Sequence, residues 1–293
     1  MLIDSFLNFL QFEKNYSEKT INSYRVDLIQ LEEYIKNDSE ELTLTEVDAD
    51  IIRQWIIDLT KKGYTTSSVN RKLSSLRSFY KFLLLKQEII KDPTRKINGP
   101  KKKKPLPIFL KEKEINKILE ETNFKEGFIG IRDQMIIEMF YATGIRLSEL
   151  IGLDNKDINF EDSLIKVKGK RNKERLIPFG DELKESMLRY ISVRDETITV
   201  KSEAFFIIEN GERLYNALVE RLVKRQLSKV VTLKKKNPHV LRHTFATAML
   251  NNEANLNAIK EIIGHTSLAA TEVYTHTTFE ELKNIYKLAH PRA

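Results

Sequence analysis

Residues 238–247 of this chain, Pro-His-Val-Leu-Arg-His-Thr-Phe-Ala-Thr, constrain its fold and function more than any other segment. The leading proline favours a helix that begins there. On such a helix His239 and Arg242 share one face, because they are three residues apart. His265 and Tyr274 follow downstream. Arginine and imidazole side chains around a hydroxyl group suit an anionic reaction centre, for which phosphate is the obvious candidate. The segment therefore predicts a phosphate-binding site with Tyr274 as its nucleophile.

A metal site is the alternative for the same helix. His239 and His243 are four residues apart, which is also the spacing of a zinc-binding pair. Val240, however, stands where zinc proteases of the H-E-x-x-H type carry their glutamate, and no third ligand is evident. We therefore expect neither a metal nor a cofactor, and we interpret His243 as a histidine that makes a structural hydrogen bond.

Arg146, far upstream, is a second candidate for phosphate binding. It follows Ala-Thr-Gly-Ile at 142–145, which ends a predicted helix. An arginine just past a glycine turn can direct its guanidinium away from its own helix and bind a phosphate through two hydrogen bonds. The alternative is an arginine that forms an ion pair with Glu149, three residues further on.

Lys170 lies in the turn of a predicted β-hairpin. Residues 163–168 and 174–178 have the composition of two strands, and the sequence Gly-Lys-Arg-Asn-Lys at 169–173 makes a basic turn between them. A flexible loop could carry the ammonium group of Lys170 into a DNA groove, where it could give a proton to a leaving oxygen. The alternative is an ordinary turn lysine.

The composition favours a nucleic-acid partner without requiring one. The chain has 293 residues, of which 41% are hydrophobic, and this is enough for two domains with real cores. Its 49 basic and 42 acidic residues give a net charge of +7, which also fits a soluble protein with a charged surface. The lack of cysteine excludes disulfides, thiol catalysis and cysteine metal sites. Neither a signal peptide nor an apolar run of roughly 20 residues is evident, so we expect a cytoplasmic protein.

The chain divides into three parts by pattern. Residues 1–91 predict a bundle of helices without strands, whose basic polar faces either meet solvent or face DNA. Residues 92–107, with four prolines and six basic residues, predict an extended linker. Its run Lys101–Lys104 either lies along a phosphate backbone or acts as a solubilising tether. Residues 108–293 predict a second, mainly helical domain.

The predicted elements can be given by number. Helices of the first part are expected to begin at Leu2, Ser17, Asp48 or Asp50, and Thr66. Its polar faces carry Arg53, Arg71, Lys72, Arg77 and Lys81. In the second domain, besides the hairpin, we expect a short strand at 204–208 and helices at 111–121, 132–141, from 146, 181–194, 214–230, 239–251, 255–263, 267–274 and 279–288.

Together these segments resemble the tyrosine recombinases, also called the phage integrase family. The family pattern is an arginine, a hairpin lysine, H-x-x-R, a further histidine or tryptophan, and a nucleophilic tyrosine. All six positions are filled here in order, and the resemblance covers essentially the whole chain and is closest to the Xer branch. The matching segments are 142–150, 169–175, 238–247, 263–268 and 273–276.

The resemblance implies a fold and a set of roles. The fold is mainly α with a small antiparallel β-hairpin or sheet, made of an N-terminal helical, SAM-like core-binding domain and a mixed α+β catalytic domain that close around DNA as a C-shaped clamp. Tyr274 would attack the scissile phosphate, form a 3′-phosphotyrosyl link and free a 5′-hydroxyl group. The other implied roles are contacts from Arg146, Arg242 and His265 to the nonbridging oxygens, proton acceptance by His239 and proton donation by Lys170.

The resemblance also implies partners and a biological role. The partner would be duplex DNA with an inverted-repeat recombination site, bound by a homotetramer on two duplexes or by a heterotetramer with a paralogue. A last helix at about 279–288 would dock into a neighbouring protomer, and the FtsK translocase is a possible activator. The function would be site-specific recombination that resolves chromosome dimers at segregation.

Three alternatives stand beside this function. An integrase or transposase of a mobile element would use the same chemistry, and a type IB topoisomerase would use similar residues. A DNA-binding protein without catalysis is disfavoured, because all six catalytic residue types are present.

Overall fold

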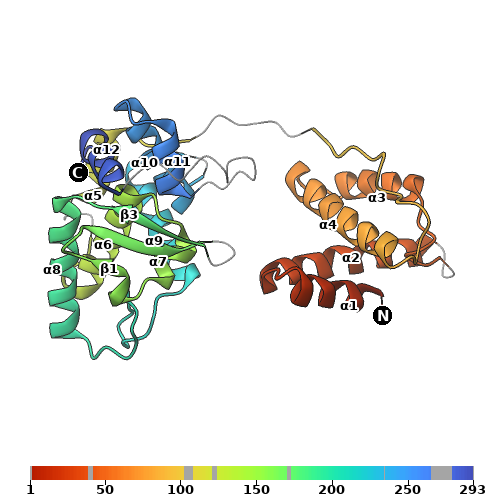
Figure 1. The fold of residues 1–293 in the computed structure, drawn as a ribbon, viewed down its shortest axis with the longest axis horizontal. Coiled ribbons are helices and arrows are strands. Elements are labelled where there is room, and N and C mark those ends of the chain that lie inside the picture. The colour runs from red at the N-terminus through yellow and green to blue at the C-terminus, as the bar shows by residue number, and fades with distance from the viewer. Residues whose placement is uncertain are drawn as a thin grey trace. The chain divides into compact units, whose positions relative to one another are not determined.

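The computed structural model describes residues 2–38, 42–101, 108–120, 124–169, 173–233, 235–264 and 279–292. The chain divides into two compact units, Met1–Pro105 and Leu106–Ala293 (Figure 1). Each unit has its own apolar core. In the described parts no helix has the length and apolar character that crossing a membrane demands.

The first unit is helical, as the sequence predicts. Its elements are α1 (Leu2–Asn8), the short π-helical turn η1 (Phe9–Glu13), α2 (Glu18–Asp38), α3 (Ala49–Lys61) and α4 (Thr66–Leu85). Two of these helices begin at capping side chains: Asp48 accepts hydrogen bonds from two backbone N–H groups of α3, and Thr65 accepts one from Ser68. Aromatic residues fill the core between the helices, and they include Phe6, Trp55, Phe79 and Tyr80.

The segment that follows α4 packs against that helix over part of its length. Ile97 is buried in the core of the first unit, and its carbonyl oxygen accepts a hydrogen bond of 2.7 Å from Arg77. The carbonyl oxygen of Pro100 accepts one of 2.9 Å from Asn70. Residues 102–107, with most of the lysine run, lie outside the described residues.

A three-stranded antiparallel sheet lies in the second unit. Its strands, in spatial order, are β1 (Ile158–Asn159), β2 (Leu164–Lys168) and β3 (Glu174–Pro178). In the β2–β3 hairpin, Val167 pairs with Arg175 and Lys168 with Glu174, which confirms the predicted hairpin. The short strand predicted at 204–208 is wrong: the described chain forms only isolated bridges there, between Asp154 and Ala204 and between Ile207 and Arg213.

Eight α-helices and one short 3-10 helix, η3 (Asn155–Asp157), are described in the second unit. The long helix α6 is its centre, because it is buried on nearly every side and packs against both α8 and α10. A helix that is apolar all round belongs in the interior of a domain. The helices are α5 (Glu112–Leu119), α6 (Gly127–Thr143), α7 (Leu147–Gly152), α8 (Asp181–Thr197), α9 (Asn216–Val230), α10 (Pro238–Asn251), α11 (Leu256–Ile263) and α12 (Phe279–Ala289). The helix predicted at 267–274 falls outside the described residues.

The last helix, α12, packs on its own unit. Leu282 and Tyr286 are buried, and the Tyr286 hydroxyl donates a hydrogen bond of 3.1 Å to the carbonyl oxygen of Ala142 at the end of α6. The imidazole of His290 stacks on the Tyr286 ring at a centroid distance of 5.0 Å. The end of α6 is therefore covered by the C-terminal segment and lies close to α10.

Candidate active site

Arg146 is placed by the turn between α6 and α7. Gly144 ends α6 in the left-handed region, with φ at 58°, and its N–H donates to the carbonyl oxygen of Phe140. A Cβ atom at this position would lie 2.5 Å from the Phe245 ring, so both the backbone angle and the packing call for glycine. The N–H of Arg146 then donates to Glu149 at 2.9 Å, as a carboxylate three residues into a helix does in a capping box.

The Arg146 guanidinium has two fixed partners. One terminal nitrogen, Nη1, donates to Oε1 of Glu149 at 2.7 Å, and the other, Nη2, donates to the carbonyl oxygen of Gly264 at 2.6 Å. The ion pair with Glu149 is thus present, and the side chain remains 27% exposed. Of the five N–H donors of a guanidinium, three have no partner among the residues that the structure describes.

Arg242 reaches the same place from the second turn of α10. It donates hydrogen bonds to the carbonyl oxygens of Gly144 and Ile263. Burial and the positive charges of Arg146 and Arg175 lower the pKa of Arg242 to about 9. Because burial and like charges disfavour the charged form of Arg242, an anion that binds beside it stabilises the guanidinium.

Glu149 and Arg175 complete the cluster, although from the sequence Glu149 was expected only as a possible ion-pair partner of Arg146 and Arg175 was not expected in the site. Both terminal nitrogens of Arg175 donate to Glu149, at 2.7 and 2.9 Å, and its Nε donates to the carbonyl oxygen of Ile262 at 2.7 Å. Burial would raise the pKa of Glu149, but the hydrogen bonds from Arg175 and Arg146 hold it at about 2, so the carboxylate stays ionised. The signal in the sequence was present, because Glu149 and Arg175 both lie within the segments that carry the family resemblance.

The cluster carries an excess of positive charge. The guanidinium groups of Arg146 and Arg175 pair with the carboxylate of Glu149, and the guanidinium of Arg242 lies near them, so the four side chains sum to +2. Unpaired positive charge in a partly buried place is costly unless an anion neutralises it. A phosphate group has the charge and the oxygen geometry that such a cluster binds.

His239 stands at the start of α10 beside the two arginines. Burial, Arg242, His243 and Arg146 lower the pKa of its imidazole below the ordinary 6.5. The ring is therefore neutral at pH 7 and able to accept a proton. His243 is exposed on α10 and has no hydrogen-bond partner among the described residues, so the structural hydrogen bond expected of it is not seen there.

The other three predicted site residues, Lys170, His265 and Tyr274, lie outside the described residues. The glycines that precede two of them are described. A Cβ atom at Gly169 would lie 3.6 Å from Oε1 of Glu149, and one at Gly264 would lie 3.0 Å from Cδ of Arg175. The chain therefore passes the Glu149–Arg175 pair immediately before Lys170 and again immediately before His265.

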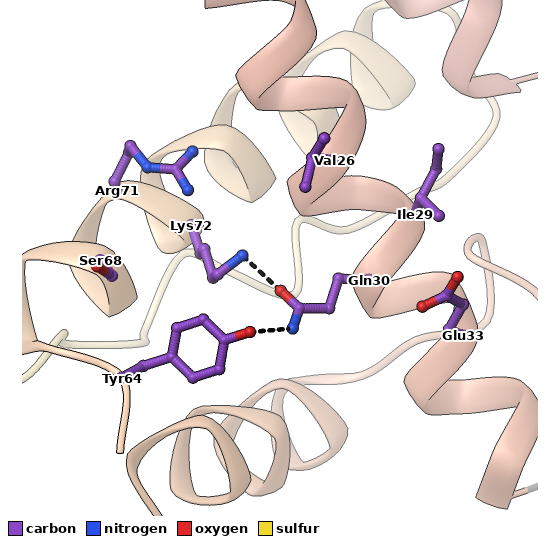
Figure 2. Close-up of a pocket in the computed structure, with 8 residues that line it drawn as sticks. All are labelled: Val26, Ile29, Gln30, Glu33, Tyr64, Ser68, Arg71 and Lys72. Carbon is purple, nitrogen blue, oxygen red and sulfur yellow. Dashed lines mark hydrogen bonds between the residues drawn. The ribbon is translucent and has the colours of Figure 1, made fainter. Parts of the chain in front are cut away.

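The first unit holds a separate polar groove, shown in Figure 2. It has a volume of about 510 Å³ between α2 and the start of α4, and Val26, Ile29, Gln30, Glu33, Tyr64, Ser68, Arg71 and Lys72 line it. Lys72 was predicted on a polar face, but it is buried in the structure. Its ammonium group donates hydrogen bonds to Asp27 at 2.9 Å and to Gln30. Arg71 pairs with Asp27 as well and remains half exposed.

Within the described parts of the chain, no group of three or more histidine, aspartate or glutamate side chains is placed to hold a metal ion. At the candidate site the structure instead brings together three arginines and the carboxylate of Glu149. The arrangement can bind an anion through guanidinium donors and can accept a proton at His239.

Comparisons with known proteins show which family the chain resembles over most of its length. A family model described as "Phage integrase family" matches residues 108–281, and one described as "Phage integrase, N-terminal SAM-like domain" matches residues 3–87. The chain is 35% identical to tyrosine recombinase XerC of Chlorobaculum tepidum, over 99% of this chain and 94% of that protein. It is also 35% identical to tyrosine recombinase XerD of Oceanobacillus iheyensis, over 99% and 98%.

Among solved structures, a similar fold is that of the XerH site-specific recombinase bound to palindromic difH substrate in a post-cleavage complex. The TM-score is 0.74 at 22% identity, and the match covers 96% of this chain and 83% of that one. At this identity the likeness concerns the fold.

Proposed function

Because the chain belongs to the phage integrase family of tyrosine recombinases, which cleave and rejoin DNA, we propose that Tyr274 is its nucleophile and that the arginine cluster binds the scissile phosphate. Site-specific recombination of DNA is the activity, and DNA is the partner. One observation carries the assignment of the site. Arg146 and Arg242, which are far apart in sequence, meet at the last turn of α11, directly before the segment that contains His265 and Tyr274.

The arginines stabilise the charge that develops during cleavage. As the oxygen of Tyr274 forms a bond to phosphorus and the bond to the 5′-oxygen breaks, negative charge grows on the nonbridging oxygens. The unengaged N–H donors of Arg146 and Arg242 bind these oxygens, and His265 adds a further hydrogen bond. The phosphotyrosyl link conserves the energy of the phosphodiester, so the reverse attack by a 5′-hydroxyl group rejoins the strand without ATP.

Two groups move the protons. His239 accepts the phenol proton of Tyr274, and its lowered pKa keeps the ring neutral for this task. Lys170 gives a proton to the departing 5′-oxygen. The proton balance closes, because one proton leaves the tyrosine and one reaches the new 5′-hydroxyl group.

The test is a suicide cleavage assay on nicked duplex DNA that traps the covalent complex. Wild-type protein is expected to become attached to the 3′-phosphate, whereas Tyr274→Phe binds the same DNA and forms no adduct. Tyr215→Phe is the matched control, because Tyr215 is an exposed tyrosine of the same unit whose hydroxyl contacts only Arg221 among the described residues. An adduct with Tyr274→Phe would show that the nucleophile is another residue.

The two units have separate tasks in this proposal. Residues 1–91 form the core-binding domain, residues 92–107 the linker, which packs on the first unit as far as Pro100, and residues 108–293 the catalytic domain. The half-exposed Arg71 supports a DNA-facing role for the α2–α4 side of the first unit. Affinity that comes from such phosphate contacts falls steeply as salt rises.

Recombination needs four active sites on two duplexes. We therefore propose a tetramer on an inverted-repeat site, with the helix at 279–288 in contact with a neighbouring protomer. The equal identity to a XerC and a XerD leaves both a homotetramer and a heterotetramer with a paralogue open to test by mixing purified proteins. Activation by FtsK would be seen as recombination that depends on added translocase.

The biological role that fits best is the resolution of chromosome dimers, in the cytoplasm where the chromosome lies. Relatives that carry the XerC and XerD names support it at near-full length. Recovery of chromosomal terminus DNA in the covalent complex is the expected result. Capture of the ends of a mobile element would point instead to an integrase.

A further inference from the structure

Arg175 lies in the site, but it is not one of the six proposed catalytic residues. It lies on β3, opposite Val167 of β2, and its side chain is only 13% exposed. Three of its five N–H donors are engaged: two with Glu149 and one with the carbonyl oxygen of Ile262. Since its guanidinium is committed to protein acceptors, Arg175 is suited to positioning other groups rather than to binding phosphate.

These contacts join three elements that are distant in sequence. Arg175 connects β3 to Glu149 of α7 and to Ile262 of α11. Glu149 in turn accepts hydrogen bonds from both the backbone and the guanidinium of Arg146. The direction of the Arg146 side chain therefore depends on where Arg175 holds the carboxylate.

The last turn of α11 is fixed by the three arginines in the same way. Ile262, Ile263 and Gly264 each offer a carbonyl oxygen, and these accept from Arg175, Arg242 and Arg146 respectively. The final carbonyl groups of a helix lack partners within the helix and carry partial negative charge, so arginines stabilise them. Without Arg175 the Ile262 carbonyl would lose this partner.

The chain also passes Arg175 closely at two points. Gly264, with φ at 69°, leaves little room for a Cβ atom, which would lie 3.0 Å from Cδ and 3.1 Å from Nε of Arg175. Gly169 lies near the other end of the guanidinium, where a Cβ atom would be 3.9 Å from Nη1. The next residues along the chain are His265 and Lys170.

We propose that Arg175 is a positioning residue for DNA cleavage, which orients Arg146 through Glu149 and fixes the end of α11 from which the chain continues to His265. This inference rests on the proposed function. It predicts that loss of Arg175 weakens the stabilisation of charge on the nonbridging oxygens, although Arg175 itself does not contact the phosphate.

The experiment measures single-turnover cleavage at saturating protein with full-length variants. The probe is a nicked suicide duplex built on the site that wild-type protein captures from chromosomal DNA. Arg175→Lys and Arg175→Ala are compared with wild type and with Arg194→Lys. Arg194 is a matched control, since it is a buried arginine of the same unit that donates to the Phe205 carbonyl, to Asn155 and to Asp195.

A second duplex separates positioning from a general loss of stability. It carries a methylphosphonate at the scissile position, which replaces one charged nonbridging oxygen by a methyl group and so removes the need to neutralise that charge. Arg146→Ala serves as the positive control, because its cleavage defect should shrink on this duplex. Thermal unfolding of each variant reports on folding.

We expect both Arg175 variants to cleave the phosphate duplex on the order of 10²-fold more slowly than wild type, as a displaced catalytic group does. Lysine should not rescue, because it lacks the planar fork that holds Glu149. The defect should shrink to less than about tenfold on the methylphosphonate duplex, as for Arg146→Ala. Arg194→Lys should cleave at close to the wild-type rate.

Three results would overturn the proposal: wild-type rates in Arg175→Lys, a defect of equal size on both duplexes, or an equal loss in Arg194→Lys. If Arg175→Ala does not fold, Arg175→Lys decides. Failure of wild-type protein to form an adduct through Tyr274 would instead refute the proposed function, so the two failures are distinguishable.

Discussion

Arg242 donates a hydrogen bond to the carbonyl oxygen of Gly144, which lies 98 residues earlier in the chain. Gly144 is also the left-handed residue that ends α6 and leads into Arg146. The turn at Gly144 thus positions the backbone of Arg146, and its carbonyl oxygen accepts a hydrogen bond from Arg242. Changes at this turn should act on both arginines together.

Gly144→Ala should destabilise the second unit by about 3 kcal/mol. A side chain in the left-handed region costs about 1 kcal/mol, and the clash with Phe245 adds roughly 1–3 kcal/mol. Gly127→Ala is the control, because Gly127 also has a positive φ but has open space around its Cβ position, so only the backbone cost of about 1 kcal/mol remains. Urea unfolding measures both, and equal losses would contradict the packing argument.

Glu149→Gln should lower the free energy of unfolding by about 3 kcal/mol and slow cleavage. The substitution keeps the shape but leaves the guanidinium groups of Arg146 and Arg175 without their carboxylate in a buried place. Glu174→Gln, which breaks an exposed pair with Lys166, should cost less than about 1 kcal/mol. Chemical denaturation of the two variants side by side would show whether burial sets the difference.

The same carboxylate predicts how stability responds to acid. The pKa of Glu149 is about 2 in the folded protein against an ordinary 4.5, so its contribution is fully present above 4.5 and is lost as the pH falls toward 2. Wild-type protein should therefore lose more stability than Glu149→Gln over this interval. Parallel losses in the two proteins would contradict the assignment.

Protonation of His239 should lower the cleavage rate in acidic solution, with a midpoint below pH 6.5. Its pKa is lowered, so the neutral base persists at pH 6.5 and becomes protonated only in more acidic solution. The second-order rate constant at limiting DNA, measured against pH, reports this titration in the free enzyme. His239→Gln should slow cleavage by roughly 10²–10⁴-fold and remove this pH dependence, whereas His243→Asn should keep it. A midpoint at or above 6.5 in wild-type protein would count against this role.

Chelation should leave cleavage unchanged. In the proposed mechanism, guanidinium groups perform the charge stabilisation that Mg²⁺ performs in two-metal nucleases. Suicide-substrate cleavage in EDTA should therefore match that in added Mg²⁺. Loss of adduct in EDTA with recovery on Mg²⁺ would argue strongly against an arginine-based mechanism.

Substitution on α12 can test assembly without unfolding the unit. Deletion of 279–293 would remove Leu282 and Tyr286 from the core, so Leu288→Ser is the sharper variant, since Leu288 is 86% exposed. If α12 contacts a neighbour, Leu288→Ser should weaken the complex on two duplexes more than binding to one site, with little change in thermal unfolding. Gel-shift titration separates the two, and an unaffected tetramer would exclude this contact.

Much of the fold followed from local pattern. Apolar spacing, a capping residue at Asp48 and a helix start at Thr66 predicted helices of the first unit, and the turn at 169–173 predicted the hairpin. Residues 204–208 have the composition of a strand but find no ladder partner, so they form isolated bridges. A strand depends on a neighbour that local sequence does not specify.

The sequence by itself predicted the chemistry of the proposed site, from an arginine after a glycine turn, H-x-x-R at a helix start, and a downstream histidine and tyrosine. These are local features, because caps, turns and helical faces act over a few residues. Only the tertiary structure decided that Glu149 joins Arg146 to Arg175, and that Arg146 meets Gly264 across 118 positions. It also buried Lys72, which helical spacing had placed on a polar face. Such contacts arise when distant helix ends pack together. Buried charges and unpaired carbonyl groups need partners wherever the fold places them, and spacing along the chain does not specify which residues these are.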